Sequence, residues 1–220
     1  MISSSLSYNG QAQQDKYVLS VLKNKTNGFF LEIGSNHPIK ISNTYLLESQ
    51  FQWKGIMIEY NPMFLSSYKV HRPNSFHVIQ NATTIDYKKL LEDCNAPTDM
   101  DYLQIDLEVL EGTTIATLQR LDNTILDKYR FATVTFEHDI YRTNEGETRR
   151  LSREIFERRG YIRVFDDIHN YGPHDVYEDW YVHPDLVDMD HIRAIQQKNI
   201  NNRVPSELTG TSIGWDVLQY

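Results

Sequence analysis

Residues 28–62 read GFFLEIGSNHPIKISNTYLLESQFQWKGIMIEYNP, and their pattern indicates the fold class of the chain. An apolar run over residues 28–34 ends at Gly34, and a second run over residues 55–59 ends at Glu59. Each run has the length of a buried strand, and a helical pattern over residues 42–49 lies between them. Two buried strands joined by a helix predict a parallel β-α-β unit.

The same alternation continues along the rest of the chain. Further strands are expected at residues 75–79, 102–106, 131–137, 161–165 and 179–182. Further helices are expected at residues 15–22, 62–70, 86–91, 113–121 and 149–158. The sequence therefore predicts an α/β fold with a Rossmann-like, mostly parallel, seven-stranded sheet and helices on both faces. The last two strands lie close together in the chain, which indicates a final antiparallel pair.

Four residues mark expected helix boundaries. Ser42 and Asp86 are predicted N-caps, because their side chains accept a hydrogen bond from the first helical turn. Pro62 suits the first turn of a helix, where its missing N–H costs nothing. Gly160 is placed to end the helix before the sixth strand.

A chain of 220 residues, 40% of them hydrophobic, can bury one full core, so a single domain is expected. We divide it into an N-terminal helical segment (residues 1–27), a Rossmann-like core (28–185) and a C-terminal helix and tail (186–220). The tail is expected to pack through Trp215, Val217 and Leu218.

The formal net charge of -8 argues against a nonspecific binder of nucleic acid or of an anionic membrane. The densest cationic stretch, residues 148–159, is interpreted as the solvated face of a helix. No apolar run reaches the ~18–20 residues of a membrane span. The N-terminus lacks the basic and apolar regions of a signal peptide, and the single Cys94 fits a reducing compartment. A cytoplasmic location, or a host cytoplasm, is expected.

Ligands of an open parallel sheet bind beyond the carboxyl ends of its strands. The first strand ends in Glu32-Ile33-Gly34, with one glycine in place of the three of the dinucleotide fingerprint, so a pyrophosphate-binding loop is disfavoured. An acid with one glycine suits a ligand with an amino group, such as the methionine part of S-adenosylmethionine. Glu59 ends the second strand and can accept hydrogen bonds from both hydroxyls of a ribose.

The fourth and fifth strands end in residues suited to chemistry. Asp106, with Glu108 nearby, is expected to position a substrate hydroxyl, to hold a cation or to cap the next helix. His138 is a candidate general base, because its pKa lies near neutrality, although a lone histidine is often structural. Asp106, Glu137 and His138 are alternatively the ligands of a hard metal ion such as Mg²⁺.

These residues carry a resemblance to a known family. Residues 32–38 (EIGSNHP), 42–48 (SNTYLLE), 52–62 (QWKGIMIEYNP), 105–111 (IDLEVLE) and 178–183 (EDWYVH) resemble motifs of the FkbM-type methyltransferases. That family uses S-adenosylmethionine, and the resemblance covers roughly residues 28–185.

The resemblance implies the class I methyltransferase sheet, with an antiparallel seventh strand. It implies methyl transfer to an oxygen, often a sugar hydroxyl, so the expected partner is a small-molecule or glycan acceptor. Asp106 would face the methyl group and the acceptor. The cofactor-binding residues so implied are Glu32, Gly34, Ser35 and Asn36 at the methionine end, Glu59 and Tyr60 at the ribose, Asn81 and Ala82 at the adenine, and Asp106.

Three departures from the family pattern leave other functions open. His37-Pro38 stands in place of Asp-Gly, Val109 in place of a glycine, and Asn81 in place of an aspartate. The alternatives are a catalytically silent module that binds S-adenosylmethionine and a methyltransferase acting on the ribose of capped RNA. A nicotinamide oxidoreductase is disfavoured by the missing glycines, and assembly into a homo-oligomer stays open.

Overall fold

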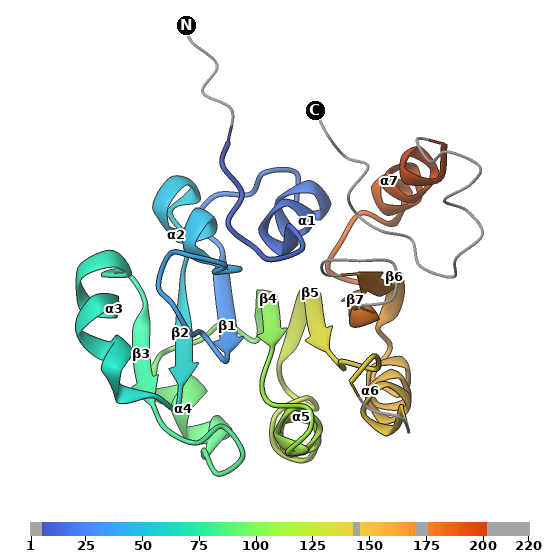
Figure 1. The fold of residues 1–220 in the computed structure, drawn as a ribbon. Helices are drawn as coiled ribbons and strands as arrows, with labels where there is room; N and C mark the ends of the chain where they lie inside the picture. The colour runs from blue at the N-terminus through green and yellow to red at the C-terminus, as the bar shows by residue number, and fades with distance from the viewer. Residues whose placement is uncertain (1–5, 143–145, 170–175, 202–220) are drawn as a thin grey trace, which may run out of the picture.

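The computed structural model describes residues 6–142, 146–169 and 176–201 of the chain. In these residues seven strands form one sheet in the order β3-β2-β1-β4-β5-β7-β6, and β7 alone runs opposite to the other six strands (Figure 1). The strands are β1 (Phe29–Ile33), β2 (Lys54–Glu59), β3 (Phe76–Ile79), β4 (Asp99–Ile105), β5 (Arg130–Glu137), β6 (Ile162–His169) and β7 (Val176–Val182). The predicted fold class is confirmed, since all seven expected strands are present.

Helices cover both faces of the sheet, as Figure 1 shows. One face packs against α1 (Gln14–Val21), α2 (Tyr45–Phe51), α3 (Leu65–His71) and α7 (Met189–Asn201). The other face packs against α4 (Tyr87–Asp93), α5 (Thr113–Thr124) and α6 (Glu147–Arg158). A short 3₁₀ turn, η1 (Pro62–Phe64), precedes α3. The core is therefore two apolar layers, one on each side of the sheet.

Strand alternation decides which side chains meet in each layer. In β1, Phe30 packs in the α1 layer, whereas Leu31 and Ile33 pack in the opposite layer. The strand register pairs Glu32 with Gln104 and pairs Glu137 with Glu178. Paired residues share a face, so these polar side chains all lie on the α1 side, near the carboxyl ends of the parallel strands.

Three of the four predicted helix boundaries are confirmed. Asp86 caps α4, with its side chain accepting from the Lys89 N–H at 3.0 Å. Pro62 lies in the first turn of η1, and Gly160 follows the end of α6 with a φ of +85°. Ser42 is the correction: α2 begins only at Tyr45, and the Ser42 hydroxyl accepts from the Tyr45 N–H at 3.2 Å from outside the helix.

The cationic stretch in α6 is less solvated than its composition indicates. Arg153 binds Asp179 at 2.7 Å and Asp167 at 2.8 Å, and its side chain is only 20% exposed. Arg158 and Arg159 both bind Asp122. These arginines therefore tie α6 to β6, β7 and α5, so the interpretation as a wholly solvated face is wrong.

Within the described residues, no helix is both long and apolar enough to cross a bilayer. The expected packing of Trp215, Val217 and Leu218 falls outside the residues that the structure describes.

Candidate functional site

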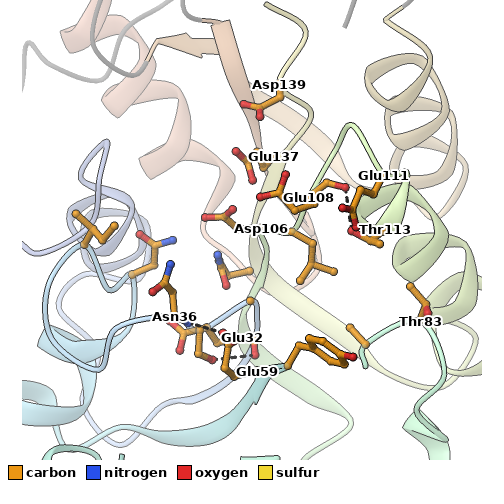
Figure 2. Close-up of a pocket in the computed structure, with 18 of the residues that line it drawn as sticks. Glu32, Asn36, Glu59, Thr83, Asp106, Glu108, Glu111, Thr113, Glu137 and Asp139 are labelled. Carbon is orange, nitrogen blue, oxygen red and sulfur yellow. Dashed lines mark hydrogen bonds between the residues drawn. The ribbon is translucent and has the colours of Figure 1, made fainter. Parts of the chain in front are cut away.

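A cavity of about 530 Å³ opens at the carboxyl ends of β1, β2, β4 and β5 (Figure 2). The nine residues predicted to bind a cofactor all line it: Glu32, Gly34, Ser35, Asn36, Glu59, Tyr60, Asn81, Ala82 and Asp106. They come from the ends of four strands that are adjacent in space but spread over 75 positions of the chain. The topology of the sheet therefore brings the sequence motifs into one site.

Gly34 makes the turn between β1 and the loop that follows it. Its φ is +90°, and a Cβ atom there would lie 1.8 Å from the carbonyl oxygen of Asp106. The N–H groups of Gly34 and Ser35 both donate to the carbonyl of Ile58, at 2.9 and 3.1 Å. Only a glycine allows the chain to pass this close to the end of β4, and the passage shapes the floor of the cavity.

Glu59 holds the rim of the cavity in place through its carboxylate. One oxygen accepts from the Asn36 N–H and the other accepts from the Asn61 N–H, both at 2.8 Å (Figure 2 draws the first). Each oxygen keeps a second lone pair that can accept from a ligand hydroxyl. The carboxylate is thus oriented before any ligand binds.

The departure at His37-Pro38 leaves this loop ordered. The Nδ1 atom of His37 accepts from the N–H groups of Ile39 and Lys40, at 3.1 and 3.0 Å. Pro38 is buried, and its carbonyl accepts from the buried Arg72 at 3.4 Å. His37 therefore binds its own loop, and the cavity beside this loop stays open.

The buried Arg72 helps to position the Glu32 carboxylate, a role that the sequence did not predict. Its guanidinium binds Glu48 at 2.8 Å and donates to the Thr44 hydroxyl, while Thr44 in turn donates to Glu32 at 2.8 Å. This chain of contacts fixes the Glu32 carboxylate at the cavity. Burial raises the pKa of Glu32, and Arg72, 4.0 Å away, opposes that shift. A single arginine in a polar stretch carries no sequence signal for such a role.

Three buried acceptor atoms at the cavity have no hydrogen-bond partner: Glu32 Oε2, Asn43 Oδ1 and Gln104 Oε1. Glu32 and Gln104 are each 1% exposed, and Asn43 is 4% exposed. Buried polar atoms normally have partners, because leaving one unpaired costs about 1–3 kcal/mol. All three are oxygens, so the cavity fits a ligand that brings N–H or O–H donors.

Asp106 and Glu137 form a proton-sharing pair at the inner end of the cavity. Burial raises the pKa of Glu137 far above its usual range, and the neighbouring Asp106 and Asp139 raise it further. Burial also raises the pKa of Asp106, but the hydrogen bond with Glu137 opposes that shift. Their hydrogen bond raises the pKa of Glu137 and opposes the rise at Asp106, so we assign the shared proton to Glu137 and treat Asp106 as the acceptor of that hydrogen bond.

His138 is not among the residues that line the cavity. It follows Glu137 directly, so its ring points to the opposite face, toward α6. There its Nε2 atom is 3.5 Å from Asp179 and 3.8 Å from Asp167. The predicted set of metal ligands, Asp106, Glu137 and His138, is not assembled. The predicted role of His138 as a general base at this cavity is corrected for the same reason.

Among the described residues, His138, Asp167 and Asp179 are the ones close enough together to share a metal ion. Both carboxylates already bind arginines: Arg149 and Arg153 each lie 2.8 Å from Asp167, and Arg153 also binds Asp179. This cluster is an ion-pair network that joins α6 to β6 and β7.

Several other residues that line the cavity were outside the prediction. Asn43, Gln104, Glu111, Asp139 and Arg142 line it, as does Glu108, which was considered for its place beside Asp106. Strand alternation could have found Gln104, two residues before Asp106, and Asp139, two residues after Glu137. Trp180 and Tyr181 do not line the cavity, because they are fully buried in the two core layers.

Glu178 predicts a pH dependence of stability. It is fully buried in β7, and burial raises its pKa to about 8. Its unfolded value is ~4.3, so the folded state binds the extra proton between about pH 4.5 and 8, and this contribution to stability is lost as the pH rises. We expect Glu178→Gln to remove up to ~1.4 kcal/mol per pH unit of that slope, as measured by urea unfolding at several pH values.

The control for this measurement is Glu92→Gln, because Glu92 is an exposed residue of α4. It should keep the slope of the unchanged protein. Equal slopes for Glu178→Gln and the unchanged protein would show that Glu178 titrates normally.

The solved structures most useful for comparison are methyltransferases. A putative rRNA methylase from Clostridium thermocellum superposes with a TM-score of 0.51, 9% sequence identity, and coverage of 81% of this chain and 97% of that chain. A TehB-like SAM-dependent methyltransferase from Corynebacterium glutamicum gives a TM-score of 0.47, 12% identity, and coverage of 82% and 91%. No protein-family model matches the chain, and no curated protein matches it. The chain therefore has the Rossmann-like fold of class I methyltransferases.

Proposed function

We propose that this protein is an S-adenosylmethionine-dependent methyltransferase of the FkbM type that methylates a hydroxyl group of a small molecule or glycan. One observation carries the proposal: nine residues chosen from sequence motifs line a single cavity at the strand ends. The methyltransferase fold supports it, because this is the edge of the sheet where ligands of such folds bind.

The residues of the cavity fit the cofactor in three places. The unpartnered Glu32 Oε2 can accept from the ammonium of the methionine part. Glu59 can accept from the two ribose hydroxyls with its remaining lone pairs. Asn81 and Ala82 line the side of the cavity that would take the adenine.

The reaction then requires two things: alignment of the acceptor oxygen with the methyl group, and removal of the hydroxyl proton. When bound, S-adenosylmethionine supplies a methyl group already activated by its sulfonium. The cavity would hold the acceptor oxygen in line with that group, and such alignment is a large part of the acceleration. Asp106, which accepts the hydrogen bond of the protonated Glu137, would take the proton of the acceptor hydroxyl.

Replacing Glu59 tests the cofactor assignment. We expect Glu59→Ala to weaken binding of S-adenosylmethionine by about 1–3 kcal/mol, the scale of hydrogen bonds to a charged group. Calorimetric titration with S-adenosylmethionine, S-adenosylhomocysteine and NAD measures this, and the unchanged protein should bind the first two and not NAD. Glu92→Ala, on the far helix α4, should bind as the unchanged protein does. Unchanged affinity in Glu59→Ala would contradict the ribose assignment.

Two alternatives are outcomes of further assays. Tight binding of the cofactor without transfer to any acceptor, tried with and without Mg²⁺, would indicate a catalytically silent module. Methylation of capped RNA would indicate a nucleic-acid substrate. The charge of the cavity disfavours RNA, because seven carboxylates line it: Glu32, Glu59, Asp106, Glu108, Glu111, Glu137 and Asp139.

A further inference from the structure

The part of the cavity beyond the proposed cofactor site is strongly acidic. Figure 2 shows the carboxylates of Asp106, Glu108 and Glu137 gathered at its upper end, with Asp139 beyond them. They come from two neighbouring segments, the end of β4 with the turn after it and the end of β5. Burial and mutual repulsion raise the pKa of Glu137, so this group of acids lacks enough positive charge around it.

Little in the described lining of the cavity balances that charge. Among the described residues that line the cavity, Arg142 is the one cationic side chain, and it binds Asp139 at 3.2 Å. The charge of Arg142 also acts on Glu108, so within the described lining this one cation faces the carboxyl groups of Asp106, Glu108 and Asp139. Each carboxylate in a partly dehydrated site favours a cation strongly, because the attraction grows as the dielectric constant falls.

A second observation points to a ligand with hydrogen-bond donors. Gln104 lies two residues before Asp106, so both side chains are on the α1 face of β4. Gln104 lines the cavity, and its buried Oε1 atom has no hydrogen-bond partner. A protonated amine offers three N–H donors and one positive charge, which would satisfy both Gln104 and the adjoining carboxylates.

We propose that the methyl acceptor carries a protonated amine next to the hydroxyl that is methylated, as in an amino sugar or another amino alcohol. The inference rests on the proposed function, since it describes the acceptor of that reaction. A phosphorylated or carboxylated acceptor would meet like charge at Asp106 and Glu108. A neutral sugar would leave these carboxylates unbalanced.

The amine is a binding group and not the site of methylation. A protonated nitrogen has no lone pair, so it cannot attack a methyl group while the carboxylates keep it charged. The hydroxyl is the nucleophile: its oxygen forms the bond to carbon, the sulfur–carbon bond breaks with its electrons going to sulfur, and the proton goes to Asp106. Charge and protons balance without any further reactant.

Matched pairs of sugars test the proposal. Glucosamine, galactosamine and mannosamine are compared with their N-acetyl forms, with glucose 6-phosphate as an anion, all against protein saturated with S-adenosylhomocysteine. We expect each amine that binds to do so at least about tenfold more tightly than its acetylated partner. Transfer of a labelled methyl group from S-adenosylmethionine should give an O-methyl product from the amine.

A variant that lacks one carboxylate distinguishes selective binding of the amine from nonspecific attraction to an acidic protein. Glu108 is exposed at the mouth of the cavity, so Glu108→Gln should fold normally. It should raise KM for the amine about five- to tenfold, and leave KM for a neutral sugar and the affinity for S-adenosylhomocysteine unchanged. Glu92→Gln removes the same charge from a distant surface and should change none of these values.

Three results would overturn the inference: equal or tighter binding of the acetylated sugars, preference for the anion, or no binding of any amine in the panel to cofactor-loaded protein. A failure to bind S-adenosylhomocysteine at all is a separate result. It would remove the proposed function, and the acceptor inference with it.

Discussion

Asp106→Asn should reduce methyl transfer by at least about a hundredfold, the lower end of what a positioned general base contributes. Asparagine keeps the shape of the side chain but cannot accept the hydroxyl proton. Its neighbour Glu137 should not replace it, because burial, the largest cause of its raised pKa, and the nearby Asp139 both remain in the variant. The measurement is kcat for an established acceptor under saturating S-adenosylmethionine, together with a calorimetric check that the cofactor still binds.

The matched control is Asp99→Asn at the other end of the same strand, β4. Asp99 is exposed and binds Arg130 at 2.8 Å, far from the cavity, so this variant should keep its activity. Full activity in Asp106→Asn would show that another group takes the proton. Parallel losses of activity and of cofactor affinity would instead place Asp106 in cofactor binding.

Gly34→Ala should destabilise the protein by more than about 3 kcal/mol, or prevent it from accumulating in folded form. The left-handed conformation alone costs a non-glycine residue roughly 1–2 kcal/mol. The added Cβ would also lie 1.8 Å from the carbonyl oxygen of Asp106, which is backbone and cannot rotate away. Urea unfolding measures the loss, and any folded variant should bind S-adenosylmethionine weakly, because β1 and β4 must separate.

Gly160→Ala separates the two causes. Its φ of +85° is close to the +90° of Gly34, but nothing lies within 4 Å of an added Cβ. It should lose only the conformational part, roughly 1–2 kcal/mol, and keep cofactor binding. Equal losses at the two glycines would show that the contact with Asp106 relaxes easily.

The fold could be predicted because strands and helices leave different periodic patterns in the sequence. Each strand of the sheet contains a short apolar run, and the helical segments carry boundary residues such as Pro62, Asp86 and Gly160. Strand ends were the least certain part: β6 extends to His169 and β4 begins at Asp99, because both continue past their apolar runs through polar residues. Such residues carry hydrogen bonds of the sheet without an apolar signal.

The position of the site could also be predicted, since it follows from the rule that ligands meet the carboxyl ends of parallel strands. The side of the sheet on which each side chain lies could be predicted too, but only if alternation is followed one residue at a time. Glu137 and His138 are adjacent in the chain and were expected to act together, yet alternation sends them to opposite faces.

The buried contacts of Arg72 that hold the site in place could not be predicted from the sequence. Arg72 reaches Glu48 and Thr44 from a helix that precedes β3, and nothing in its local sequence distinguishes it from a surface arginine. Its partners lie 24 and 28 positions away. Contacts of this kind depend on how helices pack across the sheet, which is decided by side chains distant in the sequence.

The position of the antiparallel strand β7 has a consequence for co-translational folding. Of the strands in the described residues, β7 is the last to be synthesised, yet it lies in the interior of the sheet between β5 and β6. Until residue 182 has left the exit tunnel, β5 has a bare edge of N–H and C=O groups, and such edges invite pairing with other chains. A nascent chain paused before this point already contains every acid of the cavity, but it lacks the strand that closes the sheet beside them. Folding factors that shield exposed strands should therefore matter most while the chain between β5 and the end of β7 is being synthesised.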